Sequence, residues 1–205
     1  MAKIKLTKGE LKRQRDALKQ FQRYLPTLQL KKQQLQLEIL QQTSLLQEKK
    51  QILIKKRQAI EPWAGLLADP QVDLKLFLKP EKIITRLKNI AGTDIPVFDT
   101  VEFHIVDYDL FAMPLWLDLA IEALKEAIIL NKAILVLGEG ISILRHQLRI
   151  TAQRVNLFEK VKIPSAEENI RLIKIYIGDQ MANAVGRSKI AKRKIEEFIL
   201  EGAIA

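Results

Sequence analysis

Apolar residues recur every seven positions along the first 60 residues of the chain. The series runs from Leu11 to Ile60, and only Lys32 interrupts it. Its apolar members are Leu11, Leu18, Leu25, Ile39, Leu46, Leu53 and Ile60, and Phe21, Leu28 and Leu35 lie three residues after successive members. This spacing is typical of a helix that packs along a partner helix in a coiled coil.

Local signals set the predicted ends of this first helix. Thr7 followed by Glu10 fits a capping box, so the helix is expected to begin there. Pro26 is expected to kink the helix rather than end it, because the seven-residue register continues through it. Pro62 is expected to end the helix. At about 1.5 Å per residue, a helix from Lys8 to Ile60 would be roughly 80 Å long.

A second and stronger periodic pattern follows Met113-Pro114, where a proline suits a first helical turn and Asp118 complements the positive helix end. Two lines of positions, three residues apart, are apolar except for one threonine. They are Ala120, Ala127, Ile134, Ile141, Leu148 and Val155, and Ala123, Leu130, Leu137, Leu144, Thr151 and Phe158. Pro164 is expected to break this helix.

A third helix is predicted after Pro164, with Ser165 and Glu168 forming another capping box. Its apolar positions are Ile170, Ile173, Ile177, Met181, Ala184, Ile195 and Phe198. The stripe weakens from Gly186 to Lys194, where a basic run suggests contact with something other than the partner helix.

The segment between the long helices, Pro62 to Met113, has mixed character. Leu74–Leu78 and Val97–Val106 have strand-like content, and the second alternates Val101, Phe103 and Ile105 with Glu102 and His104. Lys82–Ile90 is interpreted as a short helix, and Gly92 and Pro96 as a turn. We expect a small mixed lobe that caps one end of the paired helices.

The predicted fold is therefore mainly α: a long antiparallel two-helix coiled coil with a small mixed α/β lobe. Its segments are an N-terminal coiled-coil helix at 1–61, a central lobe at 62–113 and C-terminal coiled-coil helices at 114–205. Antiparallel packing would bring both chain ends to one tip. That tip would combine Lys3, Lys5, Lys8, Lys12, Arg13 and Arg15 with the run from Arg187 to Lys194.

The formal net charge of +10 is unevenly distributed. Residues 1–60 hold 15 Lys/Arg against 4 Asp/Glu, whereas residues 61–113 hold 5 against 9. A basic end could meet nucleic acid, acidic lipid or an acidic protein surface, or it could simply be a solvated helix face.

The chain has no cysteine, which fits a reducing cytoplasm. A membrane span of roughly 18 or more apolar residues is not expected.

Residues suited to catalysis or metal binding are sparse. Gly138-Glu-Gly140 lacks the further residues of a phosphate loop and is interpreted as a helix-packing or flexible element. His104 and His146 are the only histidines, and the pairs Asp107/Asp109 and Glu196/Glu197 are interpreted as solvated carboxylates. We therefore expect no catalytic residue, metal or cofactor, and a protein that is not an enzyme.

Three segments, in order, resemble the D-subunit family of V-type (vacuolar/archaeal-type) ATPases. They are Leu6-Thr7 with the helix that follows, Asn89–Gly92 with Ile95–Phe98, and Arg154–Glu159 with Ile163-Pro164. Tyr24–Lys32 and Gly178–Arg187 depart from the sequence usual in that family. The order of helix, lobe and helix agrees over nearly the whole chain.

The resemblance implies a non-catalytic central rotor shaft that couples ATP hydrolysis or synthesis in a catalytic ring to ion translocation by a membrane rotor. It implies a peripheral position at the cytoplasmic face of a membrane. The tip would meet the catalytic and regulatory ring subunits, and the lobe would face the membrane and contact the socket subunit of the membrane ring.

The small F subunit of the stalk would bind on the side of the shaft.

The residues assigned to the ring contact are Lys5, Lys8, Lys12, Arg13, Lys192, Arg193 and Lys194. The family signature residues Arg154, Val155, Asn156, Glu159 and Pro164 would serve helix packing or a partner, and Gly92, Pro96 and Phe98 mark the lobe.

Two alternatives stay open: a basic helical hairpin that binds nucleic acid, and a structural or secretion-associated coiled-coil scaffold. Nucleic-acid binding is only weakly supported, because no stacking aromatic residues are interleaved with the lysines.

Overall fold

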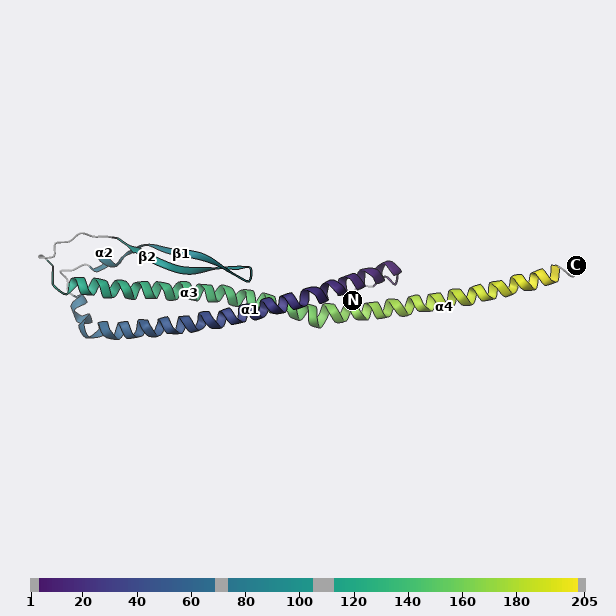
Figure 1. Cartoon of the computed structure of the whole chain (residues 1–205), viewed down its shortest axis with the longest axis horizontal. Coiled ribbons are helices and arrows are strands. Elements are labelled where there is room, and N and C mark those ends of the chain that lie inside the picture. Colours follow the sequence, from purple (N-terminus) through teal and green to yellow (C-terminus); the bar gives the residue numbers. More distant parts are fainter. Residues whose placement is uncertain (1–3, 69–73, 105–112, 203–205) are drawn as a thin grey trace. The chain divides into compact units, whose positions relative to one another are not determined.

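The computed structural model describes residues 4–68, 74–104 and 113–202. The elements are α1 (Lys8–Ile60), the 3-10 helix η1 (Glu61–Ala68), α2 (Leu74–Leu78), β1 (Pro80–Ile90), β2 (Thr93–Phe103), α3 (Leu117–Leu157), the π-helical η2 (Phe158–Lys162) and α4 (Ile163–Gly202) (Figure 1). Contacts divide the chain into unit 1, residues 1–29 and 153–205, and unit 2, residues 30–152. Each unit contains its own antiparallel helix pairing.

Helix α1 begins at the predicted cap. The N–H of Glu10 donates to Thr7 Oγ1 at 3.3 Å. The reciprocal bond of a capping box is not formed, because the Thr7 N–H donates to the Lys5 carbonyl at 3.0 Å and the Glu10 carboxylate accepts from Gln14. The helix continues through Pro26, as predicted, and ends two residues before Pro62. The kink at Pro26 stays a prediction.

The predicted apolar series on α1 faces protein along its whole length. Every member from Leu11 to Ile60, with Lys32 included, is buried or half-buried. The series on α3 behaves in the same way, since none of its twelve predicted positions is exposed. The seven-residue period therefore identified the packing faces of both helices correctly.

In unit 2, α1 packs antiparallel to α3. Leu35 and Leu144 are both 0% exposed and belong to one buried cluster, and further along Lys56 Nζ forms an ion pair with Glu126. Helix α3 begins three residues after Pro114, and the Leu117 N–H donates to the Pro114 carbonyl at 3.0 Å. The two-helix coiled coil predicted from the sequence is thus confirmed.

In unit 1, the first half of α1 packs antiparallel to the end of α3 and to α4. The rings of Phe21 and Phe158 stack with centroids 5.3 Å apart. Two turns toward the N-terminus, Gln14 Oε1 accepts a hydrogen bond of 3.4 Å from Asn169. Ile173 on α4 is fully buried in this unit.

The predicted helix break at Pro164 is wrong. The chain passes from α3 through η2 into α4 without leaving a helical path, and the Ile163 N–H donates to the Phe158 carbonyl across a π turn. A π turn adds one residue and shifts the hydrogen-bond ladder, so a proline without an N–H is accommodated just after it.

The capping box predicted at Ser165 and Glu168 is absent for the same reason, since no helix begins there. Instead, the Glu168 carboxylate accepts hydrogen bonds of 2.8 and 2.7 Å from Arg171. These hydrogen bonds lower the pKa of the Glu168 carboxyl from its ordinary value.

The central segment folds differently from the prediction in three places. Lys82–Ile90, predicted as a helix, lies in strand β1, and Leu74–Leu78, predicted as a strand, is the short helix α2. Pro96 was assigned to a turn but pairs with Leu87 inside the β1–β2 hairpin. The turn consists of Ala91 and Gly92, which have φ values of 50° and 73°.

Long-range contacts explain these differences. Ile90 and Ile95, on either side of the turn, pack into the cluster with Leu35 and Leu144, which fixes the strand pairing. Phe77 on α2 is buried against Leu117. The strand prediction for β2 is confirmed as far as Phe103, with Val101 buried and Glu102 exposed, whereas Ile105 and Val106 lie outside the described residues.

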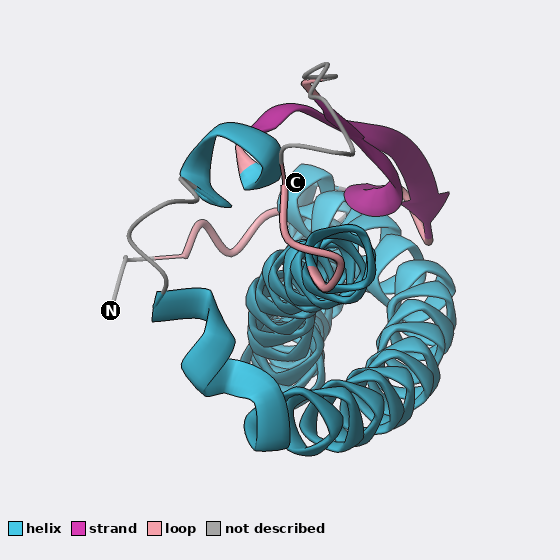
Figure 2. Ribbon diagram, turned by 90° about the vertical axis from the view of Figure 1, so that its left-hand side faces the viewer, coloured by secondary structure: helices cyan, strands magenta, loops and turns pink. Residues whose placement is uncertain are grey.

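The hairpin lies along the helices of unit 2 instead of capping their end, which corrects the expected position of the lobe (Figure 1, Figure 2). It packs closely on α3 at Gly140, where a Cβ would lie 3.5 Å from the Pro96 carbonyl oxygen, which is ordinary van der Waals contact. Gly140 thus lies against β2, while nothing lies within 4 Å of a Cβ at Gly138, so a packing requirement for glycine in Gly138-Glu-Gly140 stays a prediction.

By length and composition alone, the helical stretch Leu117–Glu197 contains a window apolar enough to cross a membrane. The expectation that no such window exists is therefore wrong. Ala133, Ile141 and Leu144 in this stretch are buried, but only 28% of the apolar window is.

Two glycine substitutions should change the free energy of unfolding in opposite directions. Gly92→Ala is expected to destabilise unit 2 by about 1 kcal/mol, because alanine is strained at a positive φ. Gly138→Ala should stabilise the chain by about 0.5–1 kcal/mol, because this helical position has open space for a methyl group. Urea unfolding followed by circular dichroism measures both, and a Gly92→Ala variant that is as stable as the original chain would contradict the assigned turn.

Candidate partner-binding surfaces

The described residues offer several exposed contact surfaces. Residues 4–68, 74–104 and 113–202 contain no group of three or more His, Asp or Glu side chains placed to hold a metal ion. Glu196 and Glu197 form ion pairs with Lys192 at 3.7 Å and with Arg193 at 3.2 Å. Asp107 and Asp109 lie outside the described residues.

Positive charge is concentrated in unit 1. Residues 1–29 and 153–205 contain 18 Lys/Arg against 9 Asp/Glu, whereas residues 30–152 contain 16 against 15. Almost all of the net charge therefore lies on one of the two units. A field of this kind attracts anionic surfaces over distances of about a Debye length.

The N-terminal basic residues lie at the start of α1. Lys5, Lys8, Lys12 and Arg13 are all exposed, and Arg13 forms only a long ion pair of 3.7 Å with Glu10. A hollow of about 390 Å³ separates the start of this helix from α4. It is lined by Leu6, Thr7, Lys8, Tyr176, Ile177, Gln180, Met181 and Ala184.

The C-terminal basic residues lie further along α4. Lys192 follows Ala184 by eight residues, which corresponds to about 12 Å of helix. The structure thus places the two basic groups one after the other along α4, whereas the sequence suggested a single combined tip. We call Lys5, Lys8, Lys12 and Arg13 the first basic zone, and Lys192, Arg193 and Lys194 the second basic zone.

The second basic zone is open to a partner. All side chains from Gly178 to Glu197 are exposed, among them the apolar Val185, Ile190 and Ile195. The intrahelical ion pairs of Lys192 and Arg193 are also exposed and contribute little stability. Both the cations and the apolar side chains are therefore available to another surface.

The family signature divides into one buried residue and several exposed ones. Val155 is buried in unit 1, whereas Arg154, Asn156, Glu159 and Pro164 are exposed. Packing therefore explains Val155 alone. The exposed residues border the π turn, and π turns are frequent at functional sites.

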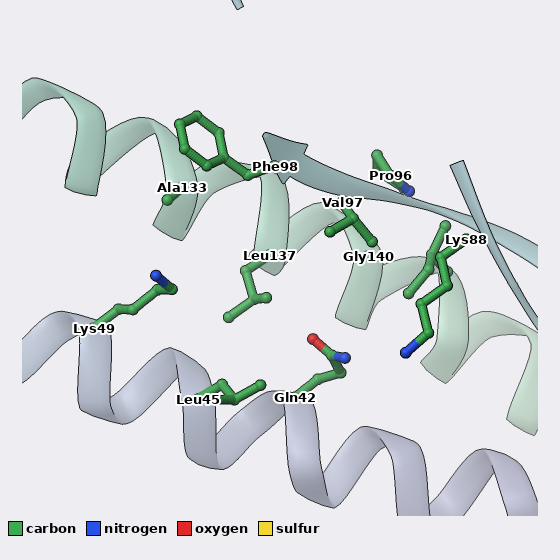
Figure 3. A pocket seen from close by; sticks show the side chains of 11 residues that line it. Gln42, Leu45, Lys49, Lys88, Pro96, Val97, Phe98, Ala133, Leu137 and Gly140 are labelled. Atoms are coloured by element: carbon green, nitrogen blue, oxygen red, sulfur yellow. The ribbon is translucent and has the colours of Figure 1, made fainter. Parts of the chain in front are cut away.

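The predicted lobe residues lie on the hairpin of unit 2. Gly92 forms the turn, and Pro96 and Phe98 line a hollow between β2 and the helices α1 and α3 (Figure 3). Sequence reasoning missed Gln42, Lys49 and Lys88, which line the same hollow. No local sequence pattern predicts that these residues lie together, because the strands and the helices meet only through tertiary contacts.

Helix α1 also carries an exposed leucine row, Leu30, Leu37 and Leu40. Leu37 is 62% exposed and Leu40 is 70% exposed, and together with Leu148 they border a groove of about 620 Å³. Leu37 follows the buried Leu35 by two residues, or about 200° of helical rotation, and so faces the opposite side of α1. A second seven-residue spacing, from Leu30 to Leu37, was the available sequence signal.

A further group of exposed leucines lies near the end of unit 2 at which η1, α2 and the first turn of α3 are found (Figure 1). Its members are Leu66, Leu76, Leu115 and Leu119, of which Leu115 is 97% exposed. Exposed apolar residues gathered in one region commonly mark contact sites for other proteins.

Paired helices that carry several exposed contact surfaces are typical of a structural subunit within a larger assembly. The comparison with known proteins identifies the assembly: the ATP synthase D-subunit family matches residues 10–193, and the chain belongs to this family. It is a component of a V-type ATP synthase, which is a membrane-associated complex, and the central-stalk role expected from the sequence fits this family.

The chain is similar to curated relatives over nearly its whole length. It is 44% identical over 195 residues to the V-type ATP synthase D subunit of Borreliella burgdorferi, covering 95% of this chain and 96% of that protein. It is 33% identical over 198 residues to the D subunit of Chlamydia caviae, covering 96% and 95%. With the D subunit of Chlamydia pneumoniae it shares 32% identity over 195 residues, covering 94% and 93%.

Proposed function

We propose that this chain is the central rotor shaft of a V-type ATPase/ATP synthase and that it is itself non-catalytic. The carrying observation is the D-subunit family match from residue 10 to residue 193, a span that includes the antiparallel helix pairing of both units. A shaft must transmit torque between a catalytic ring and a membrane rotor. Two helices packed along a shared seam resist twisting and bending better than one helix does.

Unit 1 is the part of the shaft that would turn inside the ring of catalytic and regulatory subunits. Its excess of Lys and Arg supports this assignment, as does the exposure of the two basic zones. A rotating shaft meets successive ring surfaces, so diffuse charge suits it better than one fixed bidentate contact. Exposed Val185, Ile190 and Ile195 would add apolar contact next to the second basic zone.

The exposed leucines Leu66, Leu76, Leu115 and Leu119 would contact the socket subunit of the membrane ring. This assignment places the central segment toward the membrane and the whole chain at its cytoplasmic face. The leucine side chains support a protein contact because exposed apolar area is stabilised when a partner covers it.

The small F subunit of the stalk would bind on the side of unit 2, over the leucine row Leu30, Leu37 and Leu40. The row faces away from the buried seam of α1, and the groove beside it is bordered by both long helices. The exposed signature residues Arg154, Asn156 and Glu159 of unit 1 are separate candidates for a partner contact.

The test combines recovery of partners with coupled activity. A pull-down of the tagged chain from its native membranes should recover the V-type ring subunits, the F subunit and the socket subunit in stoichiometric amounts. A reconstituted complex that lacks the chain should hydrolyse ATP without pumping ions, and adding the chain should restore ATP-driven ion transport. Failure to recover ring subunits, or transport that does not depend on the chain, would contradict the shaft assignment.

A nucleic-acid-binding hairpin is the second candidate, and the concentration of positive charge in unit 1 favours it. It requires affinity for DNA or RNA that falls steeply with salt, because each phosphate contact releases counterions. Stoichiometric recovery of nucleic-acid proteins in place of ring subunits would support this alternative.

A further inference from the structure

A hollow of about 240 Å³ lies beneath the β-hairpin in unit 2 (Figure 3). Strand β2 contributes Ile95–Phe98 to one side, and Leu45 of α1 and Leu137 of α3 contribute to the other. Gly140 of α3 lies next to Pro96 of β2, where a Cβ would be 3.5 Å from the Pro96 carbonyl oxygen. A dry cavity of about 150 Å³ is enough for benzene, so this hollow is large enough for a small ring or branched group.

The hollow has few polar groups, and only some of them have a hydrogen-bond or ion-pair partner. Glu38 accepts a hydrogen bond of 2.8 Å from Gln42 Nε2 and lies 3.5 Å from Lys88 Nζ. Lys88 therefore already has a carboxylate partner, and the Gln42 amide oxygen is left as an acceptor.

Lys49 is half-buried and has no ion-pair partner among the residues that the structure describes. A cation at the edge of an apolar hollow is solvated less fully than one on an open surface, so an anion would be favoured beside it.

We propose that this hollow binds a small amphipathic carboxylate. Its apolar body would lie between Leu45, Leu137 and Val97, and its carboxylate would pair with Lys49 Nζ. A hydroxyl or N–H group on the same molecule could donate to Gln42 Oε1. Apolar walls with a few placed polar groups are typical of small-molecule sites, and the volume is too small to enclose a whole nucleotide or phospholipid.

The carboxylate could come from a free molecule or from an acidic side chain of a neighbouring subunit, and we assign it to a free molecule. The hollow lies between elements of this one chain, with its apolar walls on β2, α1 and α3. A ligand there would hold β2 against both helices and would slow hydrogen exchange in the hairpin. The site concerns the hairpin of unit 2 and does not depend on the shaft assignment.

The test uses 4-fluorophenylacetate as the probe, with fluorine NMR on the full chain and on the V-type complex. Saturable binding with a Kd below about 10 mM is expected. Lys49→Gln should weaken it about five- to twentyfold, because a charged contact partly open to water retains part of its strength. Lys50→Gln is the matched control, since Lys50 is exposed, does not line the hollow and should leave the Kd unchanged.

Four further measurements test the charge contact and the location of the binding site. The neutral analogue 4-fluorobenzyl alcohol should bind more weakly than the acid, and raising the salt concentration should weaken only the acid. Methyl signals of Leu45, Leu137 and Val97 should shift on titration, and Ala133→Leu, which fills the hollow from α3, should abolish binding while the circular dichroism spectrum is retained.

The proposal is overturned by equal binding of acid and alcohol, by equal effects of the two lysine substitutions, or by the absence of saturable binding. Binding that is present in the isolated chain but lost in the complex would show that a neighbouring subunit supplies the carboxylate, which overturns the assignment to a free molecule. Binding retained in both supports it.

Discussion

Leu35→Ala is expected to lower the free energy of unfolding of the isolated chain by about 2–5 kcal/mol. Leu35 is 0% exposed and contacts both the hairpin residues Ile90 and Ile95 and Leu144 of α3. Removing its side chain opens a cavity where three elements meet, and the rigid strand pairing limits how far they can close on it. Urea unfolding, followed by circular dichroism, measures the change.

Leu37→Ala provides the matched control on the same helix. Leu37 is 62% exposed, so the same substitution should change the free energy of unfolding by less than about 0.5 kcal/mol. It should instead weaken capture of the F subunit by the tagged chain. Equal destabilisation by both substitutions would contradict the assigned faces of α1, and unchanged capture would contradict the proposed position of the F subunit.

The helical part of the fold was predictable because it rests on a repeated local pattern. The positions from Leu11 to Ile60 and from Ala120 to Phe158 repeat over many turns, so a single exception such as Lys32 or Thr151 does not obscure the period. Each long helix therefore had its packing face assigned correctly, and the antiparallel arrangement followed from the segment that connects them.

The hairpin was less predictable because its segments are short and ambiguous. Lys82–Ile90 contains apolar residues at spacings that suit a helix or a strand, and the choice is made by Ile90 packing beside Leu35 and Leu144. Pro164 was misleading for a different reason. A proline normally ends a helix, but the preceding π turn shifts the hydrogen-bond ladder, and no local sequence signal announces such a turn.

The candidate surfaces were also only partly predictable from the sequence. The basic zones were visible in composition, but their separation along α4 follows from the contact register of unit 1, such as Gln14 with Asn169. In the hollow, Lys49 is far apart in the sequence from Lys88 and Pro96 and meets them only in the folded unit. The clustering of basic residues is thus visible in the sequence, whereas the arrangement of the surfaces follows from tertiary contacts.

Reversing the charge of the second basic zone is expected to weaken binding of the chain to the catalytic ring. The triple substitution of Lys192, Arg193 and Lys194 by Glu should reduce the affinity at least about tenfold at low salt, because three contacts of roughly 0.2–1 kcal/mol each would become repulsive. All of these residues are exposed, so the fold of unit 1 should be retained. Affinity is measured with a ring preparation that lacks the chain, alongside ATP-driven ion transport by the reconstituted complex.

A second triple substitution separates the position of the charge from its amount. Replacing Lys50, Lys55 and Arg57 by Glu changes the net charge equally but acts in unit 2, also at exposed positions. It should leave the affinity for the ring within about twofold, because these residues lie outside the proposed ring contact and their effect is screened by salt. Equal losses for the two triples would show that overall charge is enough for ring binding, and an unchanged affinity for the first would remove the second basic zone from the ring contact.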